Sequence, residues 1–175
     1  MGLKWKTLTG SQIPDIIQWV KNETRDGQII HIGTDSLQTG RWTQFVTVVV
    51  ILNPPKGGRV AYSREIMPRI ESLRERLNKE VWKSVDLAMN MPETPELTVH
   101  IDANTDKRFK SSKYVEEFVG LVVGQGFKAL WKPDSWAATH AADHVVRLKN
   151  VERGRERLAG GNRRGRGMHP HSKSE

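Results

Sequence analysis

Three short apolar segments follow one another with only brief polar breaks between them, ahead of the first long helical pattern. They span residues 29–34, 45–52 and 59–66, and the breaks fall at residues 37–40 and 53–58. Both breaks contain Gly or Pro, which mark tight turns and loops. Connections this short join neighbouring strands in antiparallel order. The chain is therefore expected to begin its sheet as a three-stranded antiparallel meander.

The rest of the chain alternates between helical and strand patterns. Helices are expected over residues 70–89, 114–123 and about 135–149, with strands between them over 97–101 and 127–131. An amphipathic helix over residues 11–23 precedes the first strand. The order is β-β-β-α-β-α-β-α after an N-terminal helix. It predicts an α/β fold with a mixed five-stranded sheet.

Composition narrows the class of protein. The chain has 175 residues and no cysteine, so we expect one domain over residues 1–150 without disulfides or cysteine-based zinc sites. No stretch approaches the ~20 apolar residues of a membrane span. The N-terminus lacks the apolar core of a signal peptide. We therefore expect a soluble, cytoplasmic protein with no membrane partner.

The charge is unevenly spread. The net charge is +8, and the last 25 residues supply half of it with seven Lys or Arg against three Asp or Glu. Residues 151–175 are rich in Gly and Arg, so they are expected to form a basic, disordered tail. A basic body with a basic tail suits a polyanionic partner such as nucleic acid. The alternative is that the charge serves only solubility.

Four acidic residues fall where an unpaired carboxylate would be costly. Asp35 and Asp102 each end an apolar run, and so lie at the carboxyl ends of predicted strands, where sites form in such sheets. Glu80 lies within the apolar stripe of the long helix, at about 100° per residue. Asp143 lies on the last helix, on the face that carries His140 and Trp136.

Each of these positions also has a plainer explanation. Glu80 could lie at the edge of its stripe and reach water, and His140 could be a hydrogen-bonded core histidine. Asp134 follows Pro133 and is read first as the N-cap of the last helix. By strand alternation His31 shares a face with Asp35 and His100 with Asp102. For both histidines, packing is favoured over a part in the site.

Converging carboxylates suit hard divalent cations. Asp35, Glu80, Asp102 and Asp143 would hold two Mg²⁺ or Mn²⁺ ions, with Asp35 as the bridging ligand and His140 moving a proton. Two such ions about 4 Å apart can run phosphodiester hydrolysis. Basic residues interleaved with an aromatic suit nucleic-acid contact, and nearby loops carry Arg41, Lys107, Arg108, Phe109 and Lys110. A merely solvated loop is the alternative.

Four stretches resemble a known family. They are Ile32-Gly-Thr-Asp-Ser36, residues 73–81, His100-Ile-Asp-Ala-Asn104 and residues 132–144. In this order they resemble the ribonuclease H-like superfamily, and within it the YkuK-type family of predicted nucleases. The segment His140-Ala-Ala-Asp-His144 is also similar to the final-helix motif of the RuvC resolvases. The resemblance implies helices on both faces of the sheet and assigns Asp35, Glu80, Asp102 and Asp143 to metal ions.

Three functions compete at this point. The first is a metal-dependent nuclease acting on RNA, an RNA–DNA hybrid or branched DNA. The second is a nucleic-acid-binding module without catalysis, against which the intact set of acids argues, because four unneeded half-buried acids would repel one another. The third is another phosphate-handling enzyme such as a kinase. The chain contains no Gly-x-x-x-x-Gly-Lys-Ser/Thr loop, which counts against the P-loop form.

Overall fold

The computed structural model describes residues 3–24, 28–52, 57–92 and 96–137. All of them belong to one compact unit, Met1–Asp143. Four predictions lie outside the described residues: His140, Asp143, most of the last helix, and the basic tail. Within the described part of the chain, no helix is long and apolar enough to cross a membrane.

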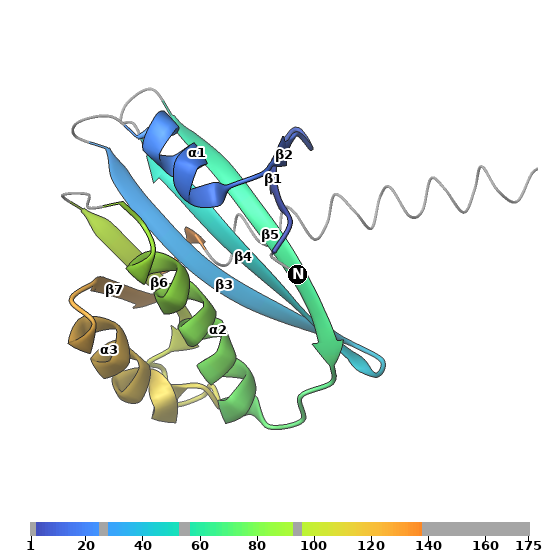
Figure 1. Cartoon of the computed structure of the whole chain (residues 1–175). Helices are drawn as coiled ribbons and strands as arrows, with labels where there is room; N and C mark the ends of the chain where they lie inside the picture. Colours follow the sequence, from blue (N-terminus) through green and yellow to red (C-terminus); the bar gives the residue numbers. More distant parts are fainter. Residues whose placement is uncertain (1–2, 25–27, 53–56, 93–95, 138–175) are drawn as a thin grey trace, which may run out of the picture. The chain divides into compact units, whose positions relative to one another are not determined.

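One mixed sheet organises the unit, and its strands lie in the order β2-β1-β5-β4-β3-β6-β7 (Figure 1). The strands are β1 Trp5–Thr7, β2 Gln12–Ile13, β3 Ile29–Thr39, β4 Trp42–Leu52, β5 Gly58–Pro68, β6 Leu97–Asn104 and β7 Lys128–Lys132. β3, β4 and β5 form the expected antiparallel meander. β6 adds parallel to β3, and β7 adds parallel to β6. The mixed α/β architecture is confirmed.

β4 runs through the middle of the sheet. Between Phe45 and Ile51 almost every side chain is buried, whichever face it belongs to. A strand covered on both faces reads as a continuous apolar run, and Val48-Val-Val-Ile51 is such a run. The core of the unit therefore extends to both sides of this strand.

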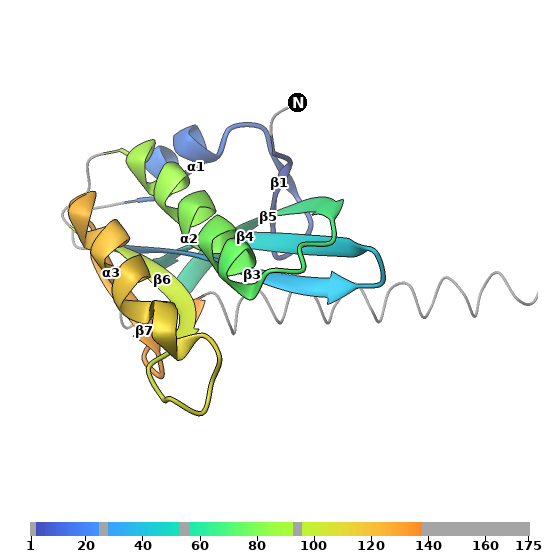
Figure 2. The ribbon, with the colours of Figure 1, turned by 90° about the horizontal axis from the view of Figure 1, so that it is seen from below.

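The described helices are α1 Ile16–Glu23, α2 Leu73–Met89 and α3 Val115–Gly124, with a 3₁₀ turn over Ser112–Tyr114. The side chain of Asp15 caps α1, and the hydroxyl of Ser72 caps α2. All three helices contribute to one apolar cluster with the same face of the sheet, and Figure 2 shows them on one side of the strands. Helices on both faces remain a prediction, because the last expected helix lies outside the described residues.

Several boundaries differ from the prediction. The sheet has seven strands and not five, because β1 and β2 extend it beyond β5. The predicted helix over residues 11–23 begins only at Ile16, since Gln12–Ile13 pairs with β1. β3 continues to Thr39, so the predicted turn at residues 37–40 is mostly strand and the chain reverses at Gly40 and Arg41. The long helix begins at Leu73 and not at residue 70.

Candidate active site

Asp35 and Asp102 occupy matching positions just beyond the last pair of a parallel ladder. β3 and β6 pair from Ile30 and Leu97 up to Gly33 and His100, and two residues further each strand carries one of the acids. The pairing of β6 with β7 is also irregular between Ile101 and Asn104. Both acids thus lie where β6 leaves its regular pairing. Asp35 does not end its strand as predicted, because the β3–β4 hairpin continues past it to Thr39.

Glu80 approaches the same point from α2. Its side chain is buried, with 2% of the residue exposed. The Ser36 hydroxyl donates a hydrogen bond of 2.5 Å to Glu80 Oε1. The guanidinium of Arg76, one turn earlier on α2, donates to the Ser36 oxygen at 2.7 Å and lies 3.6 Å from Glu80 Oε1. The residue next to Asp35 therefore joins the carboxylate of α2 to β3.

The electrostatic environment of Glu80 is unfavourable for its charged form. Burial raises the pKa of Glu80 well above its ordinary value, and the negative charges of Asp35 and Asp102 raise it further. The hydrogen bond from Ser36 and the charge of Arg76 act in the opposite direction. The three acids from β3, α2 and β6 thus interact through their charges, as a shared cation site would require.

The three acids do not all extend from one face of the sheet. Thr34 and Ser36 both hydrogen-bond to α2, through Ser84 and Glu80 respectively. Asp35 lies between them, so strand alternation directs it to the opposite face. The same alternation places Asp102 on the face of His100, away from the apolar cluster that contains Ile101 and Ala103. Glu80 therefore meets the sheet from the face opposite the two strand acids, close enough for their charges to raise its pKa.

The two strand acids also have partners. Lys132 Nζ, from β7, lies 2.5 Å from Asp102 Oδ1, and the side chain of Asp102 is 16% exposed. Asp35 Oδ1 accepts a hydrogen bond of 2.7 Å from the backbone N–H of Ser36. Positive charge from Arg76 and Lys132 thus flanks the acidic cluster on two sides. Neither basic residue was predicted, because each comes from an element remote from Asp35 in the sequence.

The donor set suits a hard divalent cation in its chemistry. Its members are carboxylate oxygens, and a cation would offset the repulsion that raises the pKa of Glu80. As placed, however, the described residues contain no group of three or more His, Asp or Glu side chains arranged to hold a metal ion. Asp143 and His140, the other predicted members, lie outside the described residues. Metal binding by this cluster therefore stays a prediction.

A histidine pair lies beneath the acids on their face of the sheet. His31 Nδ1 and His100 Nε2 are 2.8 Å apart, and both residues are buried. The backbone N–H of Trp136 donates to His100 Nδ1 at 3.3 Å, and the indole ring lies about 5 Å from both imidazoles. Since His100 Nδ1 accepts, its Nε2 carries the proton that is donated to His31. The pair packs together, as the sequence analysis favoured.

Both imidazoles are held in the neutral form. Burial lowers the pKa of His31, and the charge of Lys128 adds to this effect against a smaller, opposite effect of Glu96. Burial and the neighbouring His31 lower the pKa of His100 to about 3. Neutral imidazoles cannot offset the negative charge of the nearby acids. The pair therefore contributes packing and hydrogen bonding to this region.

The predicted nucleic-acid contacts fall in two places. Arg41 lies in the β3–β4 turn, and Lys107, Arg108, Phe109 and Lys110 lie in the loop after β6; all five are exposed. Arg108 is bound by Asp106, whose carboxylate accepts from both its guanidinium and its backbone N–H. This ion pair lowers the pKa of Asp106. Asp134 is exposed, and the helix it was expected to cap lies mainly outside the described residues.

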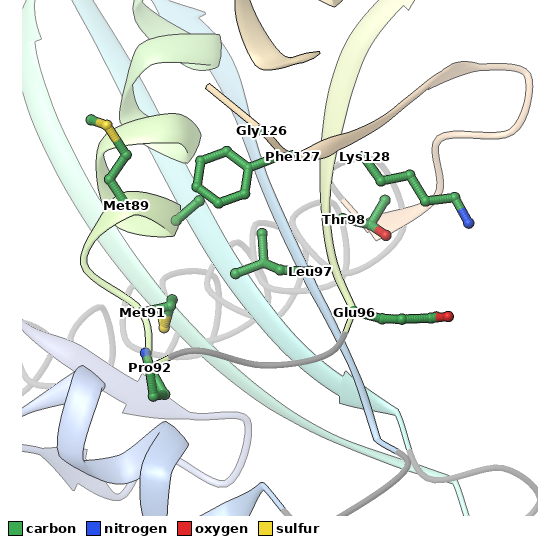
Figure 3. A pocket seen from close by; sticks show the side chains of 10 residues that line it. Met89, Met91, Pro92, Glu96, Leu97, Thr98, Gly126, Phe127 and Lys128 are labelled. Carbon is green, nitrogen blue, oxygen red and sulfur yellow. The ribbon is translucent and has the colours of Figure 1, made fainter. Parts of the chain in front are cut away.

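A pocket of about 510 Å³ lies elsewhere (Figure 3). Its walls come from the end of α2 and from the beginnings of β6 and β7, including Met89, Leu97 and Phe127. Asp102 lies toward the opposite, carboxyl end of β6, two residues beyond the last β3–β6 pair, as does Asp35 on β3. None of the predicted site residues that the structure describes lines this pocket, so it is separate from Asp35, Glu80 and Asp102.

Comparisons with known proteins match the part of the chain that carries these acids. A family model described as Ribonuclease H-like matches residues 12–147. The protein named "Uncharacterized protein YkuK" from Bacillus subtilis (strain 168) is 25% identical over 146 residues, which cover 74% of this chain and 85% of that protein. No solved structure matches. The matched region contains Asp35, Glu80, Asp102, His140 and Asp143.

Proposed function

The chain belongs to the ribonuclease H-like family, and on that premise we propose that it is a divalent-metal-dependent nuclease. Family membership by itself suggests a function related to nucleic acid. The finer proposal is hydrolysis of phosphodiester bonds in RNA, an RNA–DNA hybrid or structured DNA. The YkuK protein carries no described activity in its name, so the proposal depends on the residues of this chain.

One arrangement carries the proposal. A fully buried glutamate on α2 is hydrogen-bonded to Ser36, the residue next to Asp35, at the level where β3 and β6 carry Asp35 and Asp102. Buried carboxylates are rare unless they are paired or bind a metal. Arg76 and Ser36 compensate Glu80 only in part, because its pKa remains raised. A divalent cation is the partner that would complete the compensation.

In the proposed site Asp35, Glu80 and Asp102 hold the cations, with Asp143 as a further ligand and His140 beside it. Two bound Mg²⁺ or Mn²⁺ ions would supply an activated water and neutralise charge on the phosphate. Ser36 orients Glu80 by donating to Oε1, and Arg76 in turn fixes the Ser36 hydroxyl. Lys132 fixes Asp102 and adds a positive charge for an anionic backbone.

A cleavage assay tests the proposal. Purified protein is incubated with labelled single-stranded RNA, RNA–DNA hybrid and branched DNA, each with Mg²⁺, Mn²⁺ or EDTA. We expect cleavage of at least one substrate that needs the metal and falls by a factor of 100 or more in Asp35→Asn and Asp102→Asn. Asp86→Asn, an exposed acid on α2, serves as the matched control and keeps full activity. Cleavage that persists in both variants rejects the assignment.

A second function has its own supporting observation. Lys132 and Arg76 already place positive charge beside two of the three acids, and the described side chains form no group that holds a metal. This arrangement favours a nucleic-acid-binding module that keeps the fold without catalysis. Binding of the substrate panel without cleavage under either metal would support this second function over the first.

A further inference from the structure

The free end of the β3–β4 hairpin carries an exposed apolar surface. Leu37, Trp42 and Ile66 are 46%, 50% and 59% exposed, although each lies within a strand. We call these three residues the hairpin platform. Figure 2 shows the hairpin projecting past α2. On the helix-facing side of this end, the segment just before α2 hydrogen-bonds to the strands. There Gln38 Nε2 donates to the carbonyl of Ile70, and the Thr43 hydroxyl accepts from its N–H.

The strand pairing places the platform on the same face as Asp35. Residues directly opposite one another in antiparallel strands share a face. On β3 and β4, Asp35 pairs with Val46, Leu37 pairs with Gln44, and Thr39 pairs with Trp42. Gln44 in turn pairs with Ile66 on β5. The β3–β4 register is continuous from Asp35 to Thr39. Leu37 is two residues along β3 from Asp35 and therefore lies about 7 Å from it on the same face. Trp42 pairs with Thr39, four residues along β3 from Asp35, and therefore lies about 14 Å from the acid along the strand. The platform therefore begins beside the proposed site.

The charge of this face suits a polyanion. Arg64 pairs with Val46, which pairs with Asp35, so Arg64 is on the face of Asp35. Lys6 of β1 pairs with Tyr62, two residues before Arg64 on β5, and so is on this face as well. Arg41 lies in the β3–β4 turn. Among the described residues of β1, β4 and β5, no acidic side chain belongs to this face. Arg41 adjoins Trp42 in the chain, whereas Arg64 lies at the other end of the platform, in the row of Asp35. An aromatic ring and cations along one face, with carboxylates that would bind metal at one end, suit base stacking together with contacts to the phosphate backbone.

From these observations we propose that the hairpin platform stacks unpaired bases of the substrate, with Trp42 as the main stacking residue. The inference rests on the proposed nuclease function and narrows its substrate class to nucleic acid with a single-stranded segment next to the cleaved bond. A second copy of the chain is a poorer occupant. Three side chains at about half exposure offer far less than the ~800 Å² per partner that a stable dimer buries.

The test measures binding and not cleavage. The full chain is titrated, in EDTA, against fluorescently labelled oligo(U) and oligo(dT) and against a blunt duplex of equal length, with anisotropy as the readout. Stacking on one aromatic side chain predicts that Trp42→Ala raises the Kd for the single strands by about 5-fold or more. The Kd for the duplex should change by less than about 2-fold, because paired bases are not free to stack.

Two further variants separate stacking from folding. Trp42→Phe keeps an aromatic face and should stay within about 3-fold of the wild-type Kd for single strands. Trp82→Ala removes the other large exposed tryptophan, 42% exposed on α2, and should have no effect. Arg41→Gln should weaken both probes alike and reduce the salt dependence of binding by about one phosphate contact. An equal loss for Trp42→Ala and Trp82→Ala, or for single strand and duplex, overturns the proposal.

The outcome is independent of catalysis. If the wild type cleaves in a metal-dependent way but Trp42→Ala binds single strands normally, the nuclease proposal stands and the platform is rejected. If no metal supports cleavage but Trp42→Ala selectively loses single-strand binding, the platform stands and the nuclease proposal fails. A change in oligomeric state of Trp42→Ala on gel filtration, with unchanged oligonucleotide binding, assigns the surface to self-association and rejects the platform.

Discussion

Replacing Glu80 with glutamine should stabilise the metal-free protein at neutral pH. The amide keeps the shape of the carboxylate and an oxygen that can accept from the Ser36 hydroxyl, so the hydrogen bond to β3 is retained. What it removes is a charge that is buried, only partly compensated by Arg76, and repelled by Asp35 and Asp102. The substitution therefore isolates the electrostatic cost of the acidic cluster.

The sign and the size follow from the burial of Glu80. Its pKa is raised on folding, so the native state binds a proton more tightly than the unfolded chain, and wild-type stability falls as pH rises above the ordinary value of 4.5. Below that pH both states carry a neutral Glu80 and the advantage of the variant disappears. Removing a buried charge that is incompletely paired should raise the free energy of unfolding by about 2 kcal/mol at pH 8.

Urea unfolding in EDTA at pH 4, 6 and 8 measures this difference. Asp86→Asn, which removes an exposed acid from the same helix, should stay within about 0.5 kcal/mol of wild type at each pH. The gain of Glu80→Gln should grow from pH 4 to pH 8. A variant that is less stable than wild type at pH 8, or a difference that does not change with pH, would refute the electrostatic reasoning.

Three other perturbations test separate features of the chain. Lys132→Met removes the ammonium beside Asp102 and should enlarge the increase in Tm caused by Mg²⁺. Lys79→Met, which removes a half-exposed lysine paired with Glu75 on α2, should not; an unchanged or smaller Mg²⁺ response of Lys132→Met contradicts this. His100→Gln should cost about 1–3 kcal/mol at pH 7 in urea unfolding, because His31 and the Trp136 N–H lose their partner. The lowered pKa of His100 means that the folded wild type binds fewer protons than the unfolded chain, so wild-type stability falls as pH falls from 6.5 toward 4. His100→Gln should make this decrease less steep. A decrease as steep as that of wild type would contradict the prediction. Deleting residues 152–175 should preserve the Tm and weaken nucleic-acid binding more at low salt than at high salt, and affinity that is unchanged at every salt concentration would exclude a role for the tail.

The arrangement of the central strands could be predicted because local signals and tertiary packing agree there. The run from Phe45 to Ile51 is apolar on both faces except for Thr47, and all of it is buried in β4. The 100° period also placed Glu80 on the buried side of α2, where Leu77, Val81 and Ser84 are buried as well. The same period places Trp82 and Asp86 on the other side of the helix, and both are exposed.

The missed elements lack such agreement. β1 and β2 are only three and two residues long. Each has one buried apolar residue, Trp5 or Ile13, next to polar residues, so neither shows an alternating pattern long enough to predict a strand. Ser36 and Gln38 made the second half of β3 look like a loop, but pairing with β4 satisfies their backbone groups and extends the strand.

Within the site, the acids could be picked out because each interrupts an apolar pattern. Their basic neighbours could not. Arg76 lies in a helix rich in charged residues. Lys132 ends the short strand β7, and the position of β7 beside β6 depends on tertiary packing. The hydrogen bond between His31 and His100 likewise depends on the parallel pairing of β3 with β6, and no spacing in the sequence specifies it.

The central claim is that carboxylates from β3, α2 and β6 bind divalent cations together. Titration of Mn²⁺ into the full chain, followed by electron paramagnetic resonance of the free ion, tests it without reference to any substrate. We predict that wild type binds Mn²⁺ and that Asp35→Asn, Glu80→Gln and Asp102→Asn each weaken binding at least 10-fold, whereas Asp86→Asn does not. Wild-type protein that binds no Mn²⁺, or three variants that bind it as tightly as wild type, would contradict the claim.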